Sequence, residues 1–394
     1  MFFFFFIHAL IFIYLLVRVV LPLSARLPAK AALAAVFLVV SQHNLVRRLF
    51  GQMASPEMSG PFIIVEGFCF AALLFFFFLV LADDITALGR RAVKAVRVAR
   101  TTRSGAGGRV ASSLSDRSPG FSPGRRKALL AVAAAIPAAW GVREAVIVPG
   151  VNRMEERSAR IPRELDGLVI VHIADLHVSP LFDERWTSAL VERINGLTAD
   201  LVFITGDLVD GTPGTRARAI APLTALKARY GVFGCMGNHE YYGDFRGWKK
   251  AFPKLGITML ENRHETLTLR GRQVVVAGVT DQVATGFGLP GPDARGALAG
   301  APEGALRLML AHRPALAANN AGAGADMQFS GHTHGGQILG MNRVVARFNE
   351  GFVYGWYGVA GMRMYVSSGA GLWNGFPVRL GVPSEIARIV LRSA

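Results

Sequence analysis

LVIVHIADLH, residues 168–177, joins seven mostly apolar residues to an aspartate and a histidine two positions apart. The same order, an apolar run of strand length followed by a tight turn with a polar residue, recurs four more times: LVFITGD at 201–207, GVFGCMGNHE at 231–240, LRLMLAH at 306–312 and MQFSGHTH at 327–334. Continuous apolar runs of this length are typical of strands covered on both faces. The carboxyl ends of such strands meet at one edge of the sheet. The pattern predicts an α/β domain whose turn residues converge.

The five turns carry the side chains that bind metals in proteins. Residues two apart on an extended segment share a face, so we expect the two polar residues of ADLH to point the same way, and likewise the two outer residues of HTH. Carboxylate, imidazole and amide donors together favour Mn²⁺, Fe or Zn²⁺ over an all-oxygen Mg²⁺ or Ca²⁺ site. The candidate ligands are Asp175, His177, Asp207, Asn238, His312, His332 and His334.

Two further observations concern the number of ions and the remaining histidines. The carboxylate of Asp207 could bridge two ions about 3.5–4 Å apart, the separation used for in-line attack on phosphorus. Five of the seven histidines after residue 150 fall in the five turns, which favours one shared site over five unrelated turns. The other two, His172 and His264, are expected to be structural, with His172 packed beneath the sheet against a backbone partner.

The first third of the chain reads as a membrane region. Apolar runs at 2–23, 29–46 and 61–82 predict about three transmembrane helices within residues 1–82. Residues 128–150 contain a further apolar run, 128–148, which is either a fourth span or an export signal, since Arg125, Arg126 and Lys127 precede it. Between these, 83–127 is interpreted as a basic, flexible cytoplasmic loop, and 151–394 as the α/β domain.

The positive charge lies mainly outside that domain. The formal charge is +16 for the chain but +5 for residues 151–394, whereas 83–127 holds 11 Lys and Arg against three acids. This distribution argues against a nucleic-acid partner and favours membrane lipids. The positive-inside rule places 83–127 in the cytoplasm and, if 128–148 spans, the α/β domain outside. Arg47 and Arg48 fall on the outer side of this topology, against the rule.

A family resemblance follows from the turns taken in order. DLH (175–177), GDLVD (206–210), GNHE (237–240), AHRP (311–314) and GHTHGGQ (331–337) resemble the calcineurin-like metallophosphoesterase superfamily. The N-terminal spans, with YVSSGAGLW at 365–373 and PVRL at 377–380, resemble its bacterial membrane-associated branch. The resemblance implies a four-layer αββα sandwich preceded by a helical transmembrane region, in a multi-pass protein of the bacterial inner membrane.

The resemblance also implies a role for each turn residue. His239 would not be a ligand but would protonate the leaving oxygen or steady the phosphate. Asp210 would support a ligand or the turn, and Arg313 would contact the phosphate or pair with a neighbouring acid. The first metal would be held by Asp175, His177 and His334, the second by Asn238, His312 and His332, with Asp207 bridging.

The implied activity is hydrolysis of a phosphoester, most plainly a phosphodiester, by a bridging hydroxide at the two ions. Membrane anchoring favours an envelope or lipid-linked substrate. One alternative is an enzyme like the UDP-2,3-diacylglucosamine pyrophosphatase of lipid A synthesis, which requires a cytoplasmic active site. Another is a metal-binding scaffold, although no ligand position has been lost. Apolar residues after the third turn would form either a lip for an acyl chain or ordinary helix packing: Tyr241, Tyr242, Phe245 and Trp248.

Overall fold

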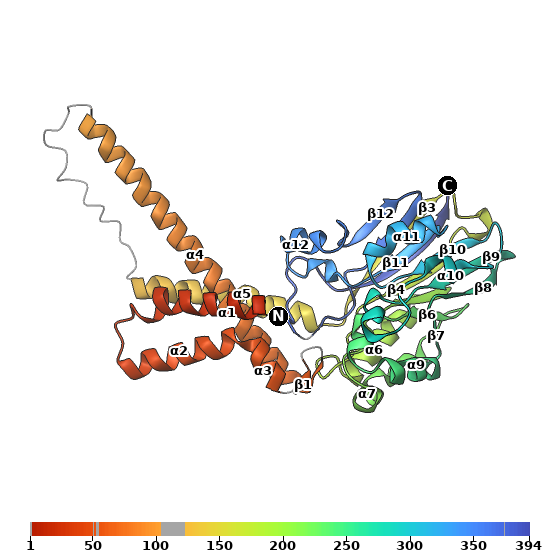
Figure 1. Cartoon of the computed structure of the whole chain (residues 1–394), viewed down its shortest axis with the longest axis horizontal. Coiled ribbons are helices and arrows are strands. Elements are labelled where there is room, and N and C mark those ends of the chain that lie inside the picture. Colours follow the sequence, from red (N-terminus) through yellow and green to blue (C-terminus); the bar gives the residue numbers. More distant parts are fainter. Residues whose placement is uncertain (1, 50, 53–54, 104–122, 374) are drawn as a thin grey trace. The chain divides into compact units, whose positions relative to one another are not determined.

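The computed structural model describes residues 2–49, 51–52, 55–103, 123–373 and 375–394 (Figure 1). It divides into two compact units. One consists of Met1–Val46 and Phe68–Trp140, and the other of Arg47–Gly67 and Gly141–Ala394.

The N-terminal part is helical. α1 (Phe2–Leu15) continues into a π-helical turn, η1 (Leu16–Val20), and is followed by α2 (Leu27–Ser41), α3 (His43–Leu49), α4 (Gly60–Arg103) and α5 (Pro123–Val146). Two-residue strands β1 (Gly51–Gln52) and β2 (Ser55–Pro56) pair between α3 and α4. In the first unit, apolar residues of α1 and η1 pack on α4 and α5 through a cluster of Ile11, Leu15, Val19, Leu73, Phe76, Val80 and Ala134.

Several of these helices suit a bilayer. Gly60–Arg97 and Gly124–Val146 are long and apolar enough to cross a membrane. The pair Leu27–Ser41 and His43–Leu49, bent by 70°, makes a third if it is one span, and Phe6–Val20 is apolar but shorter. The described residues therefore contain two or three helices that could span. The division into three spans before residue 83 and a fourth at 128–148 stays a prediction.

The segment after residue 82 differs from the sequence interpretation. Residues 83–103, interpreted as part of a flexible loop, continue α4 as helix to Arg103. The stretch lacks proline and is rich in Ala and Arg, which are strong helix formers, so the helix of the apolar span can propagate into it. The remainder of that loop, 104–122, lies outside the described residues.

The second unit contains two six-stranded sheets. One has the order β3-β14-β4-β5-β6-β7 and the other β12-β13-β11-β10-β9-β8, each with parallel and antiparallel pairs. The strands are β3 (Gly150–Ser158), β4 (Val169–Ile173), β5 (Leu201–Thr205), β6 (Val232–Cys235), β7 (Ile257–Met259), β8 (Arg263–Leu269), β9 (Arg272–Gly278), β10 (Leu306–Leu310), β11 (Met327–Ser330), β12 (Gly355–Val359), β13 (Met362–Val366) and β14 (Glu385–Ser393).

Three apolar layers hold this unit together. Alternate residues of one strand enter different layers, because successive side chains of a strand point to opposite faces. Phe203 of β5 lies between the sheets with Phe329 of β11, whereas Val202 and Ile204 pack against helices on the outer face. Both faces of the central strands are therefore buried, as their continuous apolar runs predict.

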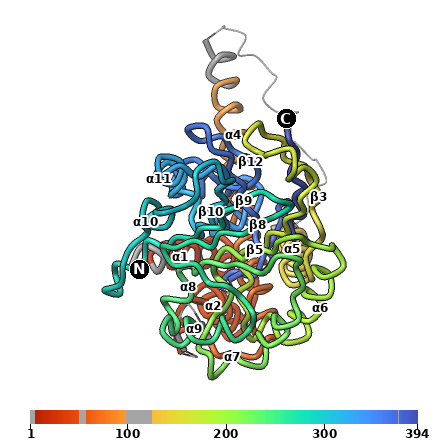
Figure 2. Tube along the Cα trace, turned by 90° about the vertical axis from the view of Figure 1, so that its right-hand side faces the viewer, coloured from red at the N-terminus to blue at the C-terminus, as the bar shows by residue number. Residues whose placement is uncertain are grey.

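Helices cover the outer face of each sheet. Figure 2 shows α10 and α11 on one side of the strands and α6 on the other. The helices of this unit are α6 (Glu184–Asn195), α7 (Pro213–Ile220), α8 (Asn238–Tyr242), α9 (Phe245–Ala251), α10 (Ala294–Leu298), α11 (Ala317–Gly322) and α12 (Asn342–Arg347). α6 and α9 contribute to the outer layer of the first sheet, and α10 and α11 to that of the second. The predicted αββα order is confirmed.

Arg47, which falls on the outer side of the predicted topology, is paired. Its side chain is fully buried, and its guanidinium donates to the Glu66 carboxylate at 2.5 and 3.1 Å. The positive-inside rule counts Lys and Arg and not net charge, so the pairing does not change this departure from the rule.

The cytoplasmic placement of 83–127, with a span at 128–148, predicts that the C-terminal end of the full chain lies outside the cytoplasm. Alkaline phosphatase fused at Ala394 and expressed in a bacterium should be active, and green fluorescent protein at the same position should be dark. Fluorescence of the green fluorescent protein fusion, together with an inactive phosphatase fusion, would place the domain in the cytoplasm and contradict the predicted topology.

Candidate metal centre

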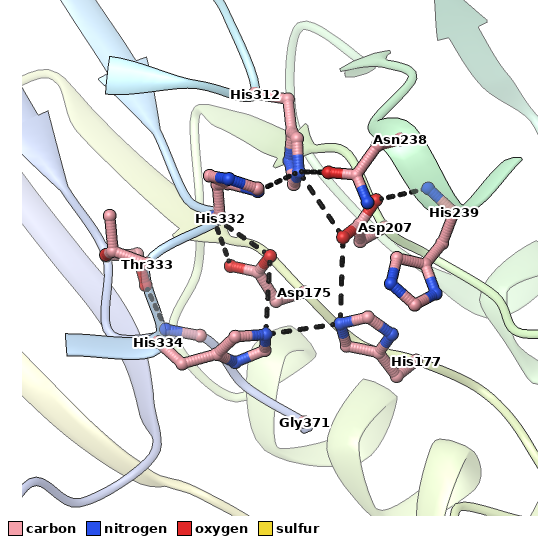
Figure 3. Close-up of polar contacts among 12 residues, drawn as sticks. Asp175, His177, Asp207, Asn238, His239, His312, His332, Thr333, His334 and Gly371 are labelled. Carbon is pink, nitrogen blue, oxygen red and sulfur yellow. Dashed lines mark hydrogen bonds and ion pairs between the residues drawn. The ribbon is translucent and has the colours of Figure 1, made fainter. Parts of the chain in front are cut away.

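The five turns singled out in the sequence meet at one edge of the two sheets. β4, β5 and β6 of the first sheet and β10 and β11 of the second each end at one of them. Figure 3 shows their side chains pointing toward a common centre. All seven predicted ligands are brought together, and all are buried except His332, which is half-buried. One ligand atom from each member lies within 4.8 Å of the others in two groups: Asp175, His177 and His334; and Asp207, His312 and His332.

The backbone reason for this convergence is not the one predicted. The residues of ADLH and HTH are not extended: Asp175, His177, Asp207, His332 and His334 have φ between 46° and 73°. L-residues rarely occupy this left-handed region, and strain of this kind is concentrated at functional sites. The left-handed turns, and not strand alternation, direct the side chains inward.

The ligand atoms are spaced as a cation requires. Atoms bound at about 2.1 Å to one ion lie about 3.0–3.4 Å apart in octahedral or tetrahedral geometry. His177 Nε2 lies 3.3 Å from His334 Nε2, and His312 Nε2 lies 3.2 Å from Asn238 Oδ1. The donors are nitrogen and oxygen atoms of the kinds that Mn²⁺, Fe and Zn²⁺ accept. The residues fit a divalent ion.

Asp207 lies between the two groups. Its Oδ2 is 3.7 Å from His177 Nε2 and 3.3 Å from His312 Nε2 (Figure 3). Its Oδ1 accepts a hydrogen bond from the backbone N–H of His239 at 2.9 Å. Asp207 can therefore offer an oxygen to two ions at once.

Hydrogen bonds to the far ring nitrogens orient two of the imidazoles. His177 Nδ1 lies 3.0 Å from Asp210 Oδ1, and His312 Nδ1 lies 2.9 Å from the carbonyl of Thr205. Both acceptors hold a proton on Nδ1, so Nε2 is the ring atom directed to the centre and able to bind an ion. An outer partner of this type is the usual way a protein fixes the tautomer of a ligating histidine.

His239 stands beside the ligands in a different role. Its Nδ1 lies 2.6 Å from Asp210 Oδ1, the oxygen that also accepts from His177. These three residues are close enough to form a third metal group, but hydrogen bonds already occupy the facing atoms. Burial lowers the pKa of His239, yet the charges of Asp210 and Asp207 outweigh it and raise the pKa to about 9. The half-buried ring can therefore carry a proton near neutral pH.

Four carboxylates are buried around the centre: Asp175, Asp207, Asp210 and Glu240. Burial, aided by the negative charge of Asp207, raises the pKa of Asp175 to about 6 and that of Glu240 to about 8. The same charges reverse the effect of burial on His312, whose pKa rises to about 10. These shifts indicate an excess of negative charge that divalent cations would offset.

Glu240 has a structural task that the sequence analysis did not assign. Its carboxylate accepts from the backbone N–H groups of Gly237, Asp207 and Leu208 at 2.7, 3.1 and 2.7 Å. It thus ties the third turn to the second. The signal available in the sequence was an acidic residue three positions after Gly237, the position of a helix capping box, which α8 confirms.

Two arginines also support the site. Arg313 pairs with buried Asp281 at 2.8 Å and reaches His332 Nε2 at 3.0 Å and Asn238 Oδ1 at 3.1 Å. The pairing with a neighbouring acid, one of its two predicted roles, is present, and contact with a phosphate stays a prediction. Arg379, which the sequence analysis did not single out, is buried and donates to backbone carbonyls beside the ligands, including those of Ser368 at 2.8 Å and His334 at 3.4 Å.

The two histidines outside the turns are structural. His264 Nδ1 donates to the carbonyl of Ala297 at 2.7 Å, as an ordinary backbone contact. His172 is buried between the sheets as predicted, but its partner is the Thr205 hydroxyl at 2.8 Å and not a backbone group. Burial lowers the pKa of His172 to about 3, so this ring stays neutral.

The aromatic residues after the third turn mostly pack within the fold. Tyr241 stacks on Phe245, and Trp248 is buried against Phe252 with its indole N–H on the Gly211 carbonyl. Tyr242 is different, because it is 38% exposed and its ring lies 5.5 Å from that of His239. Helix packing explains the first three, and Tyr242 borders the site.

Comparison with known proteins agrees with this geometry. Residues 168–336 match the model of the calcineurin-like phosphoesterase family. The chain is 32% identical over 279 residues to the zebrafish (Danio rerio) transmembrane protein with metallophosphoesterase domain, covering 68% of this chain and 63% of the relative. The bovine (Bos taurus) protein of the same description is 32% identical over 284 residues with the same coverage.

A bacterial relative is covered more fully. The uncharacterized metallophosphoesterase YkuE of Bacillus subtilis is 31% identical over 245 residues, which are 60% of this chain and 83% of YkuE. The chain spans just under two thirds of the length of the two vertebrate relatives. The family match at residues 168–336 includes the five turns described above. The chain belongs to the calcineurin-like phosphoesterase family.

Proposed function

We propose that this protein is a membrane-anchored phosphohydrolase with a dinuclear metal centre, acting on a phosphodiester. The observation that supports two ions is the position of Asp207. One of its carboxylate oxygens lies within 4 Å of a histidine from each ligand group, 3.7 Å from His177 and 3.3 Å from His312. In this proposal Asp175, His177 and His334 hold one ion, Asn238, His312 and His332 hold the other, and Asp207 joins them.

The bound ions would polarise the phosphoryl oxygens and activate water as the nucleophile near neutral pH. The chain supplies the positioning. Asp210 fixes the ring of His177, and the Thr205 carbonyl fixes that of His312, so both Nε2 atoms face the centre. Arg313, held by Asp281, limits the movement of His332 and Asn238. These contacts keep the ligands in place before substrate arrives, which lowers the cost of reaching the transition state.

His239 is the proposed general acid. Asp210 holds its Nδ1, which leaves Nε2 for the departing oxygen of the substrate. The Asp210 carboxylate beside Nδ1 favours the protonated ring, and a proton donor should have its proton in place when the bond to phosphorus breaks.

The substrate class rests on the membrane region. Two or three described helices could span a bilayer, and two relatives are named transmembrane proteins. An envelope or lipid-linked phosphoester handled at the bacterial inner membrane, outside the cytoplasm, is therefore the proposed substrate. A pyrophosphatase of UDP-diacylglucosamine type requires the domain inside, so the fusion experiment separates the two. A metal-binding scaffold is disfavoured because every ligand position is filled.

The activity itself can be tested on the full chain purified in detergent. Manganese should support hydrolysis of bis-p-nitrophenyl phosphate, measured as released p-nitrophenolate, and a chelator should abolish it. Asp207→Asn should lower the rate of hydrolysis by more than the about 10–100-fold that follows loss of an outer partner of a ligand. The reason is that the ligand shared by both ions becomes neutral. Asp166→Asn is the matched control, because the Asp166 carboxylate accepts from the backbone N–H of Ser393 and contacts none of the predicted ligands. Equal rates in both variants would contradict the dinuclear assignment.

His239→Ala should separate binding from turnover. We expect about two ions per chain by elemental analysis, as in the parent, and a rate lower by about 10²–10⁴-fold, the usual contribution of a general acid. His264→Ala removes a histidine with only a structural contact and should retain the parental rate. Full activity of His239→Ala would exclude this residue as the acid.

Asp210→Asn should impair both properties at once. The amide cannot accept equally well from His177 and His239, so metal affinity and turnover should each fall by about 10–100-fold, the range for an outer partner of a ligating histidine. Metal titration followed by rates at saturating metal measures the two losses. A loss of turnover alone would mean that His177 does not depend on Asp210.

A further inference from the structure

The segment after the last metal turn carries an apolar face with no partner among the described residues. Met341, Val344 and Phe348 are 48%, 46% and 81% exposed, and their spacing of three and four residues places them on one face of α12. Leu339, 74% exposed, precedes the helix, and Tyr354, 52% exposed, follows it. Single exposed apolar side chains are ordinary, but three on one helix face, with two more in the segments that flank the helix, mark a surface that meets something else. We call these five residues the α12 surface.

The opposite side of α12 is where the helix packs on its own unit. A Cβ at Gly336 would lie 2.7 Å from the Cα of Asn342, so the start of the helix rests directly on the GHTHGG turn. Asn342 and Ala346, four residues apart, are half-buried, in contrast to the exposed apolar face. One side of α12 therefore packs on its own unit, and the apolar face points away from that contact.

Two cations border that face. Arg343 and Arg347 are exposed and lie one turn apart on the flank between the apolar face and the packed side. Neither forms an ion pair within the part of the chain that the structure describes. An apolar face flanked by arginines is the pattern of a helix that lies in the plane of a membrane interface, with cations on anionic headgroups and aromatic rings at their level.

We propose that the α12 surface docks on the lipid bilayer to which the chain is anchored. The chain itself contains helices able to span a bilayer, so a lipid surface is always within reach of this unit. The paired arginines complement anionic headgroups, at about 1 kcal/mol for each cation near such a surface. Phe348 and Leu339, the two most exposed apolar residues of the surface, would enter the boundary between headgroups and acyl chains.

Docking would act close to the metal centre. The segment that bears the α12 surface begins three residues after His334 and ends where the Thr333 hydroxyl donates to the Val353 carbonyl. It is also fixed to the Arg379 segment, since Leu339 N–H donates to the Leu380 carbonyl at 2.8 Å and Leu380 N–H to Gln337 at 2.9 Å. If the proposed function holds, on which this step rests, the centre faces lipid headgroups and selects a lipid-borne phosphoester.

The test uses the full chain in nanodiscs of phosphatidylcholine and phosphatidylglycerol, at one chain per disc. With Cys69 and Cys235 replaced by alanine, a nitrobenzoxadiazole probe is attached at Phe348→Cys and, as the control, at Gln273→Cys, an exposed position at the start of β9, the strand end opposite the metal turns. The probe at 348 should shift to the blue and lose most of its emission to lipids with a doxyl quencher, whereas the probe at 273 should not. Arg343→Glu with Arg347→Glu should restore the emission at 348.

Quenching at 348 no greater than at 273 would overturn the proposal. A blue shift without lipid quenching, present only in discs loaded with two chains, would also overturn it and assign the surface to a second copy. The readout needs no turnover, so its failure is separate from failure of the proposed activity. A further check uses a probe at Met341→Cys. Leu339→Asp with Phe348→Asp should abolish both the blue shift of this probe and its quenching by lipid. The same double variant should leave hydrolysis of bis-p-nitrophenyl phosphate unchanged.

Discussion

Buried negative charge is the constraint on which the rest of this domain depends. Asp175, Asp207, Asp210 and Glu240 are each at most 2% exposed. An ionised carboxylate loses much of its hydration when buried, so it must be paired or bound to a cation. Burial raises the pKa of Asp175 and Glu240, whereas the charges of nearby histidines outweigh burial and lower the pKa of Asp207 and Asp210. Divalent ions would complete the balance.

The surrounding structure holds these charges at fixed positions. Glu240 accepts from four backbone N–H groups, and Gly237 allows the close approach of the turns, since a Cβ there would lie 2.2 Å from Asp207 Oδ1. On the other side, burial lowers the pKa of Arg379 to about 10, while Asp175 and Glu385 act in the opposite direction. Arg379 donates its hydrogen bonds to backbone carbonyls, including that of Gly371 at 2.9 Å. Its charge faces the acidic centre without neutralising any single carboxylate.

The sequence was sufficient for the strands, because these follow from local patterns, and the family resemblance supplied the order of the layers. The ligand set stays a prediction whose seven members the structure brings together. Apolar runs such as 201–205 specify strands buried on both faces, and the histidines cluster at strand ends. It was insufficient where the outcome depends on distant partners. The left-handed backbone of Asp175 and His334 is imposed by packing between turns 157 residues apart, as in the contacts of the His332 N–H with the Asp175 carboxylate at 3.0 Å. The helical course of 83–103 was missed because charge was given more weight than helix propensity.

Sharing of one oxygen couples metal binding to proton donation. Asp210 Oδ1 accepts from both His177 and His239, and its Oδ2 has no partner in the described part of the chain. A carboxylate that serves two imidazoles cannot be tuned for one without affecting the other. Arg216, which donates to the backbone carbonyl of Asp210 at 2.8 Å and to Glu57 at 2.7 Å, fixes its main chain. Glu57 lies between α3 and α4 and is three contacts from the proposed acid, through Arg216 and Asp210.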